Sequence, residues 1–211
     1  MQIVHYGHAC VLLETDSARV LIDPGAFSTG FEGQCELDAV LITHQHFDHI
    51  DSEKLPALME ANPDARLIVD PGSEETVAKL DLRARTVQPG DALEFGNTAV
   101  NVVGGSHAVI HPDVPLVPNV GYIFDHGAFY HPGDSFYQPE QRIDVLGLPT
   151  GAPWLKVSEA VDFLRAVRPR LAVPIHEAVL ARPAMHYGMF TNLAPEGTEV
   201  RVLPRDEPAA L

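Results

Sequence analysis

The densest group of chemically reactive side chains lies between Thr43 and His49. This segment reads Thr-His-Gln-His-Phe-Asp-His, and it follows directly on Ala39–Thr43, a continuous apolar run typical of a strand buried on both faces. Imidazole and carboxylate groups bind zinc, and also iron or manganese. A loop leaving a strand end can direct several such groups into one cleft. The alternative, a polar turn that happens to be rich in histidine, does not explain why so many hydration-demanding groups crowd an apolar strand. The spacing therefore predicts a metal site.

Three later segments each combine a turn residue with a candidate ligand. They are Gly104-Gly105-Ser106-His107, Pro132-Gly133-Asp134-Ser135 and Pro174-Ile175-His176-Glu177. Two glycines before His107 permit close backbone approach, Asp134 follows a predicted strand, and His176 ends a buried one. For each residue the simpler alternative is a surface histidine, a turn aspartate or a hydrogen-bonded core histidine. Taken singly, each of these segments is a weak signal.

Short segments of β type dominate the chain, and helical segments are interspersed in both halves. Strands are predicted at Gln2–Tyr6, Ala9–Glu14, Arg19–Asp23, Ala39–Thr43, Arg66–Asp70, Ala92–Phe95, Ala99–Val103, Val120–Phe124, Ala128–Tyr130, Leu171–Ile175 and Glu199–Leu203. Helices are predicted at Glu53–Glu60, Glu74–Leu80, Ser158–Val167 and Pro183–Asn192, and Asp206–Leu211 is expected to be a loose tail. Two similar βα halves packed sheet against sheet would fit this order.

Composition limits the classes of protein and partner. The 211 residues and 23.0 kDa suit a single domain spanning residues 1–211. A formal charge of −15 without any basic run argues against nucleic acid and against anionic membranes as partners. Two cysteines, no basic and apolar leader and no apolar stretch long enough to span a bilayer predict a cytoplasmic protein.

With these segments, the sequence resembles the metallo-β-lactamase-fold hydrolase superfamily, and within it the small cytoplasmic lactonase-like hydrolases. The resemblance covers essentially the whole chain. It rests on Tyr6-Gly7-His8-Ala9, Leu21-Ile22-Asp23-Pro24-Gly25, the segment His44–His49 and the three later segments. It implies an α+β fold, an αββα four-layer sandwich of two mixed β-sheets flanked by helices, with the metal site at one edge of the sheets.

The resemblance also implies two metal sites, each for a divalent ion. His44, His46 and His107 would hold the first metal, Asp48, His49 and His176 the second, and Asp134 would bridge them. Zinc is the expected metal, with manganese or iron as alternatives. Asp48 is also the candidate catalytic residue that takes the proton of the nucleophile and returns one to the leaving group. Asp23 is a candidate for orienting a ligand histidine.

Three further histidines are candidates for lining the substrate cleft. They are His8, in a turn between two predicted strands, His111, four residues after His107, and His131, just before the Pro-Gly-Asp segment. For His8 and His111 a structural role is an equal alternative, and the role of His131 is open. His186 is interpreted as part of a helix face.

The function predicted from these features is a dinuclear metal-dependent hydrolase acting on a small-molecule substrate. A hydroxide bridging the metals would cleave an ester, a lactone or a phosphodiester. The bridging position is Asp134 rather than cysteine, which argues against antibiotic hydrolysis. Alternatives are a metal-dependent binding or sensor module and a nuclease of the same fold, the latter disfavoured by the charge. Formation of a homo-oligomer stays open.

Overall fold

Two mixed sheets of seven strands each form the centre of the molecule. The coordinates are a computed structural model that describes all 211 residues. The first sheet has the order β14-β1-β2-β3-β4-β5-β6. Its strands are β1 (Gln2–His5), β2 (Val11–Glu14), β3 (Arg19–Ile22), β4 (Ala39–Leu41), β5 (Arg66–Val69), β6 (Ala84–Thr86) and β14 (Pro208–Ala210).

The second sheet has the order β13-β12-β11-β10-β9-β8-β7. Its strands are β7 (Ala92–Phe95), β8 (Thr98–Gly104), β9 (Val120–Phe124), β10 (Phe129–His131), β11 (Val145–Pro149), β12 (Leu171–Ile175) and β13 (Glu199–Val200). Both sheets join an antiparallel part to a parallel part, with β3 to β6 parallel in the first and β10 to β13 parallel in the second.

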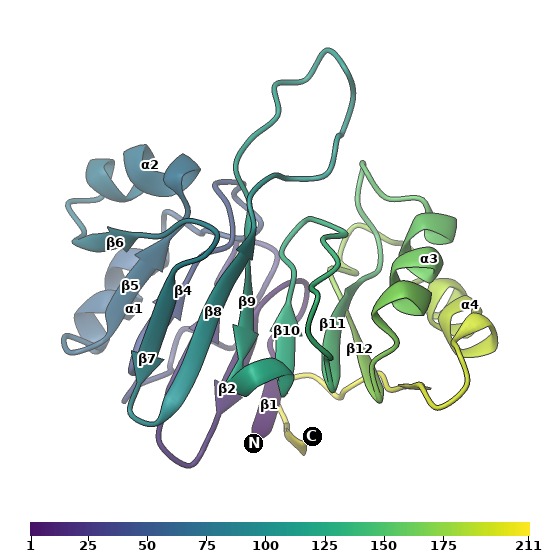
Figure 1. Cartoon of the computed structure of the whole chain (residues 1–211). Coiled ribbons are helices and arrows are strands. Elements are labelled where there is room, and N and C mark those ends of the chain that lie inside the picture. The colour runs from purple at the N-terminus through teal and green to yellow at the C-terminus, as the bar shows by residue number, and fades with distance from the viewer.

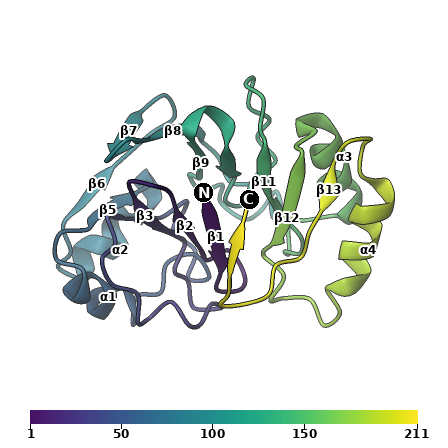
Figure 2. The same ribbon diagram turned by 90° about the horizontal axis from the view of Figure 1, so that it is seen from below.

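Helices cover the outer face of each sheet, which gives four layers (Figures 1 and 2). The helices α1 (Leu55–Ala61) and α2 (Glu74–Lys79) lie on the first sheet, and α3 (Val157–Val167) and α4 (Ala184–Leu193) on the second. Two 3₁₀ turns, η1 (Pro71–Ser73) and η2 (Asp125–Gly127), complete the regular structure. The predicted αββα sandwich is confirmed. No helix of the structure is both long enough and apolar enough to cross a bilayer.

Alternating side chains on the strands explain the layers. On β2, Val11 and Leu13 point into the core between the sheets, whereas Leu12 points outward into the core beneath α1 and α2. A third apolar cluster joins the outer face of the second sheet to α3 through Phe163 and Leu164. Because side chains alternate along a strand, a strand covered on both faces must be apolar at every position, as the burial of β4 and β12 shows.

Three strands were not predicted, and one of them corrects the expectation of a loose C-terminal tail. The strands β6 and β11 lie where no strand was expected, and β14 falls within Asp206–Leu211. It pairs antiparallel with β1, so that Ile3 lies opposite Ala209, and both chain ends meet at this edge (Figure 2). Pairing covers an otherwise open sheet edge, and Ala209 and Leu211 pack against the central core.

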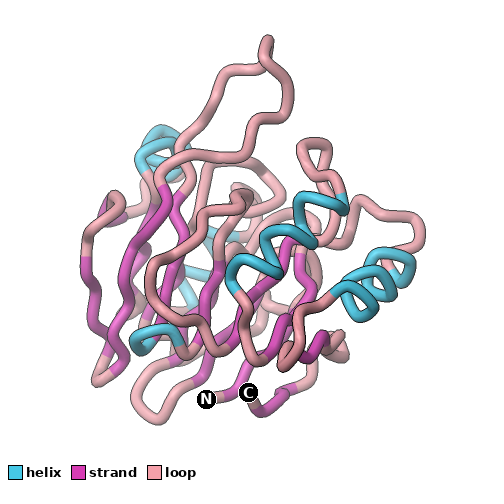
Figure 3. The backbone as a smooth tube through the Cα atoms, turned by 45° about the vertical axis from the view of Figure 1, so that its right-hand side comes forward, coloured by secondary structure: helices cyan, strands magenta, loops and turns pink.

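The strand directions bring the functional loops to one edge of the sandwich. In the first sheet β1, β3 and β4 run in the same direction, and in the second sheet β8, β10, β11 and β12 do so. The loops that follow these strands therefore emerge together. One of them, residues 105–119 between β8 and β9, projects well beyond the sheets (Figure 1), and much of the remaining loop structure gathers at the same end (Figure 3).

Candidate metal centre

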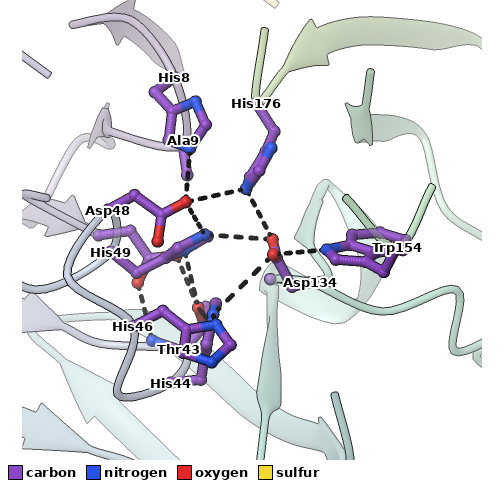
Figure 4. A network of polar contacts seen from close by, with 12 residues as sticks. His8, Ala9, Thr43, His44, His46, Asp48, His49, Asp134, Trp154 and His176 are labelled. Atoms are coloured by element: carbon purple, nitrogen blue, oxygen red, sulfur yellow. Dashed lines mark hydrogen bonds and ion pairs between the residues drawn. The ribbon is translucent and has the colours of Figure 1, made fainter. Parts of the chain in front are cut away.

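Two groups of potential metal ligands lie side by side at this edge. His44, His46, His107 and Asp134 form one group, and His8, Asp48, His49 and His176 form the other. Within each group the ligand atoms all lie within 4.8 Å of one another. The seven predicted ligands thus converge from the loops after β4, β8, β10 and β12, in the division that the resemblance implies. These ligands are labelled in Figure 4, with the exception of His107.

Asp134 lies between the two groups with one carboxylate oxygen toward each. Its Oδ1 is 3.1 Å from Nε2 of His49 and 3.1 Å from Nε2 of His176. Its Oδ2 is 3.3 Å from Nε2 of His107 and 3.9 Å from Nε2 of His44. This is the position that a bridging carboxylate requires.

The donor atoms at the centre fit divalent metal ions. Nε2 of His49, His107 and His176 and Oδ1 of Asp134 are buried and make no hydrogen bond within the protein. Buried polar atoms without partners are rare because each costs its full desolvation energy. Four such atoms facing one another, all imidazole nitrogen or carboxylate oxygen, match the donor set of zinc, iron or manganese.

Hydrogen bonds at the far ring nitrogen orient the histidines for metal binding. Nδ1 of His49 donates to Oδ2 of Asp23 at 2.7 Å, Nδ1 of His176 donates to the carbonyl of Gly151 at 2.7 Å, and Nδ1 of His107 donates to the carbonyl of Ala108. A neutral ring that donates through Nδ1 presents a lone pair on Nε2. The partners therefore turn Nε2 of all three rings toward the centre, and Asp23 has the orienting position predicted for it.

Thr43 orients a fourth ring through the same carboxylate. Its hydroxyl donates to Oδ2 of Asp23 at 2.7 Å and lies 3.1 Å from Nδ1 of His44. The hydroxyl hydrogen is used by Asp23, so the hydroxyl oxygen accepts from Nδ1 of His44. Nε2 of His44 then carries a lone pair, and it lies 3.0 Å from Nδ1 of His46. Thr43 was not singled out in the sequence, although it stands directly beside the histidine cluster.

His8 differs from the other rings in the direction of its hydrogen bonds. Its Nδ1 accepts the backbone N–H of Ala178 at 3.3 Å, so Nε2 carries the proton and donates to Oδ2 of Asp48 at 3.0 Å. A nitrogen that carries a proton is not a ligand. His8 is fully buried and is placed to hold Asp48, which is the structural role that stood as the equal alternative to lining the cleft.

Of the other two predicted cleft residues, His131 does not reach the cavity, whereas His111 lines hollows beside the centre to which His107 and Trp154 also contribute. His131 is fully buried, with Nε2 donating to the carbonyl of Ala9 at 2.9 Å and Nδ1 accepting from the N–H of Gly133, so it joins backbone segments and does not reach the cleft. His111 is exposed on the projecting loop, where Nδ1 accepts the N–H of Asp113. Hydropathy does not distinguish these positions, because only the tertiary structure decides which way a ring points.

Trp154 contacts the centre although no sequence pattern pointed to it. Its indole Nε1 donates to Oδ2 of Asp134 at 2.8 Å, and its side chain is buried. The residue follows β11, which was not predicted as a strand, so nothing indicated that its loop reaches the site. The only available signal was that it is the single tryptophan of the chain.

The charges at the centre stabilise one another. Burial alone would raise the pKa of Asp134 and of Asp48, but the neighbouring histidines outweigh burial and hold both pKa values well below the usual range. Burial alone would lower the pKa of His176, yet the charge of Asp134 raises it to about 9. Burial dominates at His8 and lowers its pKa to about 4, which keeps this ring neutral.

Three of the residues at the centre have strained backbones. His8, Asp23 and His176 adopt positive φ angles of 51°, 50° and 61°, in the left-handed region that favours glycine. The N–H of His176 donates to the carbonyl of His8 at 2.7 Å, which joins the loops after β12 and β1. Such strain costs roughly 1–3 kcal/mol per residue and is concentrated at functional sites.

The fold and the paired ligand clusters define the class: this is a metal-dependent hydrolase with the metallo-β-lactamase fold. The family model described as the beta-lactamase superfamily domain matches residues 2–176, and the chain belongs to this superfamily.

Individual relatives agree with this assignment. The protein Rv0786c of Mycobacterium tuberculosis is 48% identical over 212 residues, covering 98% of each chain. A UPF0173 metal-dependent hydrolase of Thermoplasma acidophilum is 25% identical over 83% of each chain. Among solved structures, the metallo hydrolase Igni18 of Ignicoccus hospitalis superposes with a TM-score of 0.75 at 21% identity, over 99% of this chain and 97% of that one.

Proposed function

We propose that the protein is a dinuclear hydrolase that cleaves a small ester, lactone or phosphodiester. The observation that carries the proposal is the position of Asp134, whose two oxygens face two separate sets of imidazole nitrogens. His44, His46 and His107 would hold one ion, and Asp48, His49 and His176 the other. Two divalent ions, zinc foremost and manganese or iron as alternatives, supply a nucleophile from water near neutral pH and polarise the substrate oxygen.

Asp48 is the proposed proton carrier because it is the more accessible of the two central carboxylates. Its side chain is 15% exposed, compared with 4% for Asp134. It lines the cavity above the centre together with His46 and His107. A proton taken up by Asp48 from water can be delivered to the leaving group from the same position. His8 assists by holding Oδ2 of Asp48 through its Nε2–H, and so fixes the carboxylate plane.

The experiment combines metal analysis with a panel of substrates. The zinc-loaded protein is expected to contain two metal ions per chain and to hydrolyse at least one member of a set of p-nitrophenyl esters, lactones and bis-p-nitrophenyl phosphate. Asp134→Ala is expected to abolish turnover while the protein stays folded, because both ions lose their shared carboxylate. A metal-loaded protein that binds such compounds without turning any of them over would instead favour a binding or sensor module.

A further inference from the structure

Apart from candidate metal ligands, the cavity above the metal centre is lined only by apolar residues. It has a volume of about 330 Å³, and five of its eleven lining residues belong to the candidate ligand groups. The other six are Phe27, Phe47, Ile110, Pro153, Trp154 and Val179. Every lining residue outside the ligand groups is therefore apolar, and the only polar group among the six is the indole N–H that Trp154 donates to Asp134.

These apolar side chains come from different loops and meet only at the cavity. Phe27 follows β3, Phe47 follows β4, Ile110 lies in the projecting loop after β8, and Val179 follows β12. They are 38%, 62%, 37% and 44% exposed, respectively. The rings of Phe27 and Phe47 touch edge to face with centroids 5.2 Å apart. Large apolar side chains left in water around one opening are typical of a ligand-binding surface.

The six apolar lining residues provide no counter-charge and no free hydrogen-bonding group for a charged or hydroxylated substituent. The cavity is lined by no lysine, arginine, serine, threonine, asparagine, glutamine or tyrosine, and its only charged side chains, apart from the histidines, are Asp48 and Asp134. A phosphate or carboxylate on the non-reacting part of a substrate would meet no counter-charge there beyond the ions. A buried hydroxyl would lose its hydrogen bonds to water without replacement, which disfavours binding.

We infer that the substrate is an uncharged ester or lactone whose non-reacting part is a hydrocarbon group that packs on Phe27, Phe47 and Ile110. The inference rests on the proposed hydrolase function and selects among its substrates. In the reaction the bond between the acyl carbon and the leaving oxygen breaks. A bond from that carbon to the oxygen of water forms, and a proton of the water passes to the leaving oxygen, so no other reactant is needed.

Turnover tests the inference through acyl chain length. With the zinc-loaded protein, p-nitrophenyl acetate, butyrate and hexanoate are compared with bis-p-nitrophenyl phosphate. Each added methylene that leaves water is expected to raise kcat/KM by roughly two- to fourfold, and the phosphodiester is expected to be the poorest substrate. Ester turnover whose kcat/KM does not rise with acyl chain length would overturn the inference, and so would a preference for the phosphodiester. Either result would leave the hydrolase function in place.

A binding measurement separates the inference from the hydrolase function. Acetate, butyrate and hexanoate, the acid products, are titrated into the zinc-loaded protein, and the fluorescence of Trp154 reports binding because no other tryptophan is present. Affinity should rise with chain length in the same way. Graded binding without turnover of any ester, lactone or phosphodiester of the panel would support the apolar site and refute hydrolysis. Absence of both binding and turnover would refute both.

Two variants of the projecting loop test whether the dependence of kcat/KM on chain length arises at this cavity. Ile110→Asn places an amide on the wall and is expected to reduce the hexanoate-to-acetate ratio of kcat/KM by about tenfold. Val114→Asn is the matched control, because Val114 is 45% exposed on the same loop but does not line this cavity. It should leave the ratio unchanged. Zinc content and Trp154 emission verify that both variants are folded, and equal ratios in the two variants would argue against the assigned wall.

Discussion

The indole Nε1 of Trp154 donates to Oδ2 of Asp134 at 2.8 Å, and it does so from one side of the metal centre only. The oxygen that receives this bond faces His107, whereas Oδ1 faces His49 and His176 and receives no hydrogen bond. The two groups of candidate ligands therefore have different electrostatic surroundings, although the same carboxylate lies between them.

Replacing Trp154 by phenylalanine should weaken metal binding. Trp154→Phe keeps an aromatic ring in place but removes the N–H that orients Asp134. Loss of a group that orients a ligand typically costs about 10–100-fold in metal affinity. Competition with a chromophoric chelator measures this affinity. Phe136→Leu is the control. The ring centroid of Phe136 lies 5.1 Å from that of Trp154, but Phe136 does not bond to Asp134. Affinity equal to the wild type in Trp154→Phe would contradict an orienting role.

Removal of the His8 imidazole should reduce turnover but not the number of bound metal ions. The ring donates to Asp48 through Nε2, and its Nδ1 is occupied by the N–H of Ala178. His8→Ala is expected to lower kcat by 10-fold or more, since proton transfer by a positioned group contributes about 10²–10⁴-fold. His8→Gln, whose amide can donate from a similar position, should recover part of the rate. Metal analysis showing one ion in His8→Ala would identify His8 as a ligand instead.

Metal binding should release protons. In the metal-free protein the charge of Asp134 raises the pKa of His176 to about 9 against the effect of burial, and the pKa of His49 is also raised well above its usual value. With a pKa of about 9, His176 is protonated at pH 7.5 and must lose this proton to bind a metal ion, so at least one proton should leave.

Calorimetric titration of zinc in two buffers of different ionisation enthalpy counts these protons. The contribution of His176 should disappear as the pH rises through about 9. His176→Gln should release about one proton fewer at pH 7.5. A heat of binding that is independent of the buffer at pH 7.5 would be incompatible with protonated rings in the metal-free centre.

Ionisation of Asp70 should destabilise the fold at neutral pH. Burial, with a smaller contribution from the charge of Asp23, raises the pKa of Asp70 to about 6 even though its carboxylate accepts from Gly72 and Ser73. A folded-state pKa above the unfolded value of about 3.9 favours the folded state below pH 4, and this advantage is lost as the pH rises through about 6.

Asp70→Asn cannot ionise and can still accept the N–H of Gly72. Relative to the wild type, its free energy of unfolding should therefore rise by ~1–3 kcal/mol between pH 4.5 and pH 7.5. Urea unfolding of both metal-free proteins at the two pH values measures this difference. Asp64→Asn, at an exposed position of the same half, is the control. A difference between wild type and Asp70→Asn that does not change with pH would disprove the titration of Asp70.

Local patterns were sufficient for most of the elements and insufficient for a few. The strands β7, β9 and β12 have the predicted bounds, because each is a compact apolar or alternating run between turn residues. The strand β11 was missed, since Val145–Pro149 contains glycine and proline and is strongly apolar only in part. The strand β14 has no β pattern at all, and it forms because the edge of β1 lies beside it.

By itself the sequence determined which ligand types the centre contains and how the residues from His44 to His49 are spaced, because a short loop after a buried strand keeps them together. The resemblance added Asp134, and only the tertiary structure decided that His8 and Trp154 join them, and in which roles. These residues meet because strands of two sheets end at one edge, and their roles depend on ring orientation and left-handed backbone angles that long-range hydrogen bonds impose.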